Sequence, residues 1–253
     1  MAYPTVSKPY GFRPINLIGG QPYAGSTRSM RIASGYAQNI FYGDPVKILR
    51  DSTSGLPIDG TVVVQDLSAA SLGSVGSVAS QPYTIGVFMG CSFTNPYTKQ
   101  KMFSQYYPAN TIADDIQAYV VDDPDALFKV VYVNNVPNYY DDVYSAGGVV
   151  PGAVGAQYIG RNLLVAVNPG NTTTGDSLYG VADFYNPLFI VQQPLMPVRV
   201  VDVVPETATS AGFVELIVKW NMPGYQVDGE GGTMYWGGGH EYYWPGTTGD
   251  AIL

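Results

Sequence analysis

The sequence has 253 residues, of which only 13% are charged, against about 25% in typical soluble domains. Its 12 basic and 20 acidic side chains give a formal net charge of −8, and a single cysteine, Cys91, excludes an internal disulfide framework and a multi-cysteine zinc site. Aromatic side chains, including 21 tyrosines, suit surfaces that become buried on association. The composition therefore favours a protein that works in an assembly. The alternative is a secreted or cold-adapted protein that relies on uncharged polar residues.

The first 30 residues are rich in glycine and proline and show little hydrophobic periodicity. We expect an extended arm over 1–30, held by contacts instead of by a core of its own. Residues 1–50 contain six basic residues and one acidic residue, whereas 51–253 contain six and nineteen. An acidic body repels nucleic acid, so the basic arm is expected to bind an acidic protein surface. The candidate partner-binding residues in the N-terminal part of the sequence are Phe12, Arg13, Arg28 and Arg31.

Short strand-like segments dominate residues 31–222, the predicted β domain. From Ile85 to Phe93 the side chains alternate between two faces with the period of a half-buried strand, which places Cys91 in the core. The turn sequence NPYT that follows predicts a hairpin ending near Tyr107. About a dozen such segments without βαβ alternation predict an all-β fold, an antiparallel β-sandwich or barrel that is jelly-roll-like.

After residue 222 the composition shifts to glycine and aromatic residues, which predicts a C-terminal extension over 223–253. It contains three further candidate partner-binding residues, Tyr235, Trp236 and Trp244, and the only histidine, His240. Such rings can stack on sugars or on a neighbouring protein, so the sequence leaves both kinds of partner open.

Signals of catalysis and metal binding are weak. A Cys91–His240 pair is the one nucleophile arrangement that the chain offers, but Cys91 falls on the apolar face of a strand, where thiols are inert. The DDPD stretch, 122–125, lacks the spacing of a calcium loop and is interpreted as a turn. We expect no catalytic residue, no metal and no cofactor. Without an apolar run of 18 residues or an apolar leader, no membrane partner is expected, and the protein should stay in the cytoplasm that makes it until it is carried out.

Four blocks occur in order over residues 8–130: KPYGFRPINLIGG, IASGYAQNIFYGDPVKI, IGVFMGCSFTNPYTKQKMFSQYYPAN and AYVVDDPDALFKV. Together they resemble a family of capsid cement or decoration proteins, which are virion structural proteins of tailed phages of aquatic bacteria, including cyanophages. The resemblance thins over about 135–195, resumes in VRVVDVVPETATSAGFVELIVKWN and does not cover the C-terminal extension.

The resemblance implies a non-enzymatic protein of the capsid surface, made in the cytoplasm of the host bacterium. It implies that the protein binds the major capsid protein, stabilises the phage head and forms a homo-oligomer, with a trimer favoured. A virion receptor- or carbohydrate-binding protein is the alternative that the aromatic extension favours. The major capsid protein itself and an enzyme acting through His240 or Asp122 fit less well, because the chain lacks a long amphipathic helix and a catalytic motif.

Overall fold

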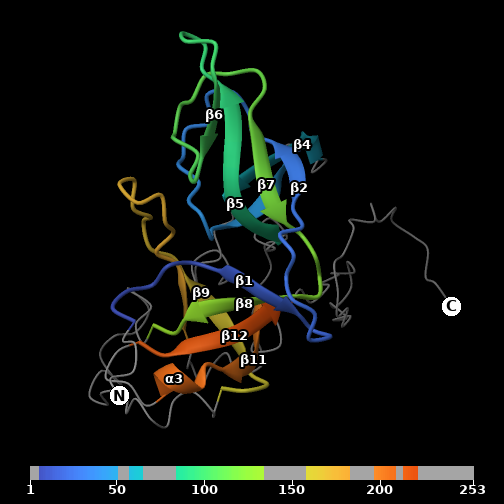
Figure 1. Ribbon diagram of the computed structural model, residues 1–253, viewed down its shortest axis with the longest axis vertical. Coiled ribbons are helices and arrows are strands. Elements are labelled where there is room, and N and C mark those ends of the chain that lie inside the picture. The colour runs from blue at the N-terminus through green and yellow to red at the C-terminus, as the bar shows by residue number, and fades with distance from the viewer. Residues whose placement is uncertain are drawn as a thin grey trace, which may run out of the picture.

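The computed structural model describes residues 6–50, 57–64, 84–133, 158–182, 197–208 and 213–221. These residues form twelve strands in two six-stranded sheets and one short helix, α3 (Pro205–Ala208). The predicted all-β fold, with a closed barrel as one of its parts, is confirmed. The two sheets lie one above the other along the long axis of the molecule (Figure 1).

The first sheet, called the barrel below, is built from one continuous stretch of chain, residues 28–121. Its strands run in the order β3-β4-β2-β7-β5-β6, and an additional β3–β5 pairing closes five of them into a ring. Strand β6 lies outside the ring and pairs with β5. The strands are β2 (Arg28–Arg31), β3 (Pro45–Arg50), β4 (Pro57–Val64), β5 (Thr84–Thr94), β6 (Lys101–Ser104) and β7 (Gln117–Val121).

The second sheet has the order β1-β8-β12-β11-β9-β10. Strand β1 pairs directly with β8, so the barrel is inserted between two neighbouring strands of this sheet. Its last strand, β10, returns to the end of β8, where Tyr132 and Val181 form a parallel bridge. The strands are β1 (Arg13–Leu17), β8 (Ala126–Val131), β9 (Asn162–Ala166), β10 (Gly180–Ala182), β11 (Val198–Val203) and β12 (Glu215–Trp220).

From residue 6 onward, the N-terminal segment is held by contacts with the rest of the fold. Phe12 has no exposed surface and packs against Phe128 and Trp220, with ring centroids 6.3 and 4.8 Å away. Strands β1 and β2 enter different sheets, and the expected boundary at residue 30 falls within β2. Because β1 and β2 contain only five and four residues, they show too little periodicity to be recognised.

The long strand β5 departs from the unbroken alternation that its sequence predicts. Its register against β7 shifts between Phe88 and Cys91, next to Gly90, whose φ is 128°. A β-bulge of this kind changes the face to which the following side chains point. Phe88 and Cys91 therefore lie together in the barrel core, whereas Val87 belongs to the core of the second sheet. The predicted hairpin and the buried position of Cys91 are confirmed.

Replacing Phe12 by alanine should lower the free energy of unfolding by about 3–5 kcal/mol, because it empties a fully buried aromatic position. Urea unfolding followed by circular dichroism measures this loss. As the control, Phe103→Ala should change the stability by less than about 0.5 kcal/mol, since Phe103 is 75% exposed. A Phe12→Ala protein of unchanged stability would contradict the assignment of Phe12 to the core.

Candidate functional site

Three segments meet where the barrel joins the second sheet. They are residues 11–13, residues 40–44 before β3, and residues 167–179 between β9 and β10, a loop that rises from the second sheet toward the barrel (Figure 1). The amide of Phe12 donates to the carbonyl of Gly43 at 3.0 Å, and the amide of Gly11 donates to Tyr179 at 2.9 Å. We call these three segments the junction.

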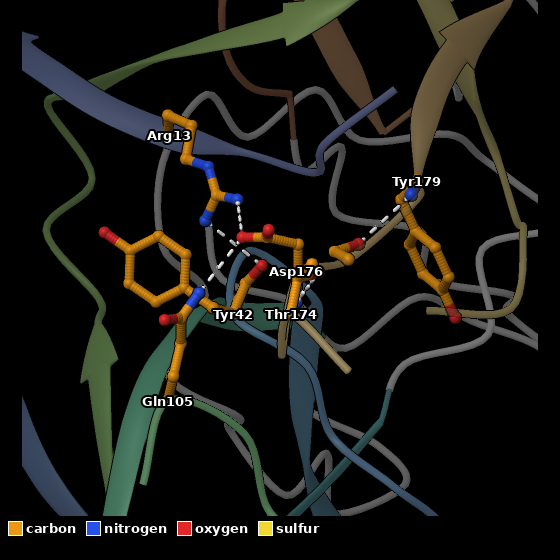
Figure 2. Close-up of polar contacts among 7 residues, drawn as sticks. Arg13, Tyr42, Gln105, Thr174, Asp176 and Tyr179 are labelled. Carbon is orange, nitrogen blue, oxygen red and sulfur yellow. Dashed lines mark hydrogen bonds and ion pairs between the residues drawn. The ribbon is translucent and has the colours of Figure 1, made fainter. Parts of the chain in front are cut away.

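Arg13 is the central side chain of the junction (Figure 2). Its guanidinium forms an ion pair with Asp176 at 2.7 Å, donates to the carbonyl of Tyr42 at 3.2 Å and lies 4.1 Å from the centroid of the Tyr42 ring. Gln105 donates to the same Asp176 oxygen at 3.0 Å. Arg13 thus binds an acidic residue of its own chain and contacts the segment before β3, and its expected role as a contact to an acidic partner stays a prediction.

Asp44 is a buried carboxyl group in the same junction, with 2% of its surface exposed. One oxygen accepts the amide of Phe41 at 2.8 Å, and the other has no hydrogen-bond partner among the residues that the structure describes. Burial raises the pKa of Asp44 to about 6, against the opposing effects of the Ser177 hydroxyl, the Phe41 amide and Arg13. A carboxyl group this enclosed has no access to a substrate, so its effect is on the stability of the junction.

A second polar cluster fastens the N-terminal segment to the outer face of the second sheet. The Tyr10 hydroxyl donates to Glu215, whose carboxylate also pairs with Lys129 at 3.1 Å. Burial, together with the hydrogen bond and the charge of Glu215, raises the pKa of Tyr10. Glu215 is only 6% exposed, although its place in the alternation of β12 predicts a solvent-facing side chain. The sequence gives no signal that Tyr10 covers it.

The candidate catalytic groups that the structure describes are held in structural roles. Cys91 is 1% exposed, and burial raises the pKa of its thiol to about 12, which leaves it protonated near neutral pH. Asp122 pairs with Arg28 at 2.9 Å, and Asp123 accepts the amide of Asp125, as expected for a turn. Within the described ranges there is no group of three His, Cys, Asp or Glu residues that could hold a metal ion.

The structure separates the remaining candidate partner-binding residues. Arg28 and Arg31 lie on β2 of the barrel, apart from Arg13 in the junction, so the three do not form one basic arm. Arg28 is bound to Asp122, whereas Arg31 is exposed beside Gln117 of β7. The other candidates, Tyr235, Trp236 and Trp244, and also His240, lie outside the described residues.

The barrel exposes large apolar side chains at the β5–β6 hairpin and the connection that follows it. Tyr97 is 92% exposed, Phe103 75%, Ile112 69% and Met102 41%. We call these four residues the apolar end. The sequence predicts the hairpin but not the exposure of these four side chains, because the alternation of an edge strand does not show which of its faces lacks a covering layer.

The apolar end is held in place by hydrogen bonds. The side chain of Asn95 accepts the amides of Tyr97 and Thr98 at 2.9 and 3.2 Å. Asp115 accepts the amide and the hydroxyl of Thr94, at 2.8 and 2.7 Å, and pairs with Lys101 at 2.8 Å. These bonds join the connection that carries Ile112 to the base of the tip. Tyr97 is therefore presented on a preorganised turn.

Comparisons with known proteins find no family model, no curated protein and no solved structure that matches the chain. Among the described residues, no helix is long and apolar enough to cross a membrane. The interpretation of the site therefore depends on its own geometry.

The difference in stability between the wild-type protein and the variant Asp44→Asn should depend on pH. The folded pKa of Asp44, about 6, lies above its usual value of 3.8, so the wild-type protein loses stability relative to the variant as the pH rises through 6. Between pH 4 and pH 8 the change should be about 2–3 kcal/mol. Urea unfolding of both proteins at the two pH values measures it.

The matched control is Asp114→Asn, which alters an exposed carboxyl group of the barrel. Its stability difference from the wild type should be the same at both pH values. A constant difference for Asp44→Asn as well would show that Asp44 is ionised without cost in the folded protein.

Proposed function

We propose that this protein is a non-enzymatic capsid cement or decoration protein, which binds the outer surface of the major capsid protein lattice and stabilises the head of a tailed phage. It is made in the host bacterial cytoplasm and acts on the capsid surface of the virion. The observation that carries the proposal is the apolar end, where a hydrogen-bonded hairpin holds Tyr97 almost wholly in solvent. The four sequence blocks and the low content of charged residues support it.

A decoration protein works through contact area, and the apolar end has the properties of such a contact. Tyrosine is enriched among the residues that dominate binding energy at protein interfaces. Because the Asn95 side chain already fixes the turn, Tyr97 loses little conformational freedom on binding. An interface of standard size, about 1,600 Å², would extend over neighbouring parts of the barrel.

The distribution of charge supports contact through the barrel. Residues 28–121 carry six basic and six acidic side chains, whereas the rest of the chain carries six and fourteen. The sequence along the chain indicated a basic N-terminal end, but folding distributes those basic residues over both sheets. Residues 28–121 therefore carry no net formal charge, so the stretch of chain that builds the barrel approaches another protein without the repulsion that an acidic stretch meets.

The proposal includes self-association, since decoration proteins are expected to occupy symmetric positions on a shell. The trimer expected from the resemblance stays a prediction, which light scattering of the purified protein tests by mass.

Replacing Tyr97 by alanine should weaken binding to phage heads that lack this protein by about 30-fold, the effect of losing a contact worth about 2 kcal/mol. Co-sedimentation of purified protein with such heads over a range of concentrations gives the dissociation constant. Circular dichroism and thermal unfolding should be unchanged, because the side chain is 92% exposed.

As the control, Val201→Ala alters an exposed apolar side chain on β11 of the second sheet and should leave head binding unchanged. If the wild-type protein does not sediment with heads at any concentration, the proposed function is wrong. If Tyr97→Ala binds as tightly as the wild type, the contact lies elsewhere on the molecule.

A further inference from the structure

Strand β6 is an outer strand with an open edge. In the sheet order it pairs with β5 only, so along its other side the backbone groups of Lys101–Ser104 face no strand among the described residues. An open edge of this kind is a template for pairing with another strand. Its side chains Met102 and Phe103 are 41% and 75% exposed.

The other outer strands are covered by the chain itself. Residues 21–23 run along β1, where the amide of Tyr23 donates to Ile15 and that of Leu17 donates to Gln21. Strand β10 meets the end of β8, where the amide of Val133 donates to Val181 at 2.8 Å. In the part of the fold that the structure describes, β6 is thus the outer strand without such a cover.

We propose that the open edge of β6 pairs antiparallel with the β6 edge of a second copy of this chain, about a twofold axis at Phe103. The proposed function includes association of copies on a shell, and this contact is one way in which they associate. It rests on the proposed function only because both require self-association. The two barrels then share one continuous sheet, and their hairpin tips point in opposite directions.

The side-chain alternation restricts the register of this pairing. Met102 lies opposite Phe93, a core residue of the barrel, so Phe103 points to the outer face together with Lys101. In a continuous sheet, outward residues lie opposite outward residues. An axis at Phe103 places the two Phe103 rings opposite each other and each Lys101 opposite Gln105 of the other copy. An axis at Lys101 would place like charges opposite each other, which is unfavourable.

The charges favour a second copy as the occupant. Because the barrel has balanced charge, two barrels can meet at β6 without net repulsion. The remainder of each chain carries eight more acidic than basic residues. In Figure 1, β6 lies beside β5 above the second sheet, so antiparallel pairing at β6 places the two second sheets at opposite ends of the dimer. A nucleic acid would instead require an excess of basic residues near β6.

A single engineered cysteine tests both the contact and its register. The natural Cys91 is 1% exposed, so it does not react in the folded protein. In the full-length chain, Phe103→Cys should form a disulfide-linked dimer on mild oxidation, because residue 103 lies opposite its own copy. The controls Tyr97→Cys and Val201→Cys place a thiol at the tip and on β11, which the proposed axis keeps apart, and should stay largely unlinked on a non-reducing gel.

Light scattering of the wild-type protein during size-exclusion chromatography gives an independent measurement. We expect a dimer whose population grows with concentration, instead of the trimer that the resemblance implies, and a monomer for Phe103→Glu, which brings two like charges together at the axis. Circular dichroism should show that this variant is folded, as the side chain is 75% exposed.

The proposal is overturned by a wild-type monomer at all concentrations, by equal cross-linking at positions 97, 103 and 201, or by a trimer whose mass Phe103→Glu does not change. Each of these results leaves the head-binding measurement with Tyr97→Ala intact, so failure of the β6 contact and failure of the proposed function are distinguishable.

Discussion

Three consecutive residues, Gly11, Phe12 and Arg13, hold the barrel and the second sheet together. A side chain at Gly11 would place its Cβ 2.5 Å from that of Ser177, so only glycine allows this close approach. Phe12 fills the core of the second sheet while its amide bonds to Gly43 before β3, and Arg13 binds Asp176. Because the barrel is inserted between β1 and β8, this segment fixes the position of the barrel relative to the second sheet. Phe12 has no exposed surface as a result, whereas the side chain of Arg13 is 20% exposed.

Local pattern was enough to predict the strands but not their arrangement. The β5–β6 hairpin and its turn at Asn95 depend on neighbouring residues, and both appear in the structure as predicted. The β3–β5 pairing that closes the barrel and the ion pair between Arg13 and Asp176 join residues far apart in the chain, for which a single sequence carries no signal. The bulge at Gly90 could not be predicted for another reason, because a glycine in a strand fits a regular position as well as a bulge.

For the candidate site, composition favours association but does not indicate the surface at which it occurs. A low content of charged side chains and a high content of aromatic side chains favour association. Which aromatic side chains are buried and which are exposed, however, depends on the fold. Phe12 and Phe103 are both phenylalanines near short strands, and they are 0% and 75% exposed. The charge pattern misled for the same reason, because the basic N-terminal residues separate once β1 and β2 enter different sheets.

The apolar end is not explained by the needs of folding. Tyr97 gains almost no burial from the folded state, and a fixed turn that displays it restricts the backbone without adding to a core. The Asn95 and Asp115 hydrogen bonds nevertheless fix that turn and its base. Ordering this turn costs conformational entropy and adds little to the stability of the isolated fold. Such a turn is consistent with a surface shaped for binding, because the turn does not have to become ordered when a partner binds.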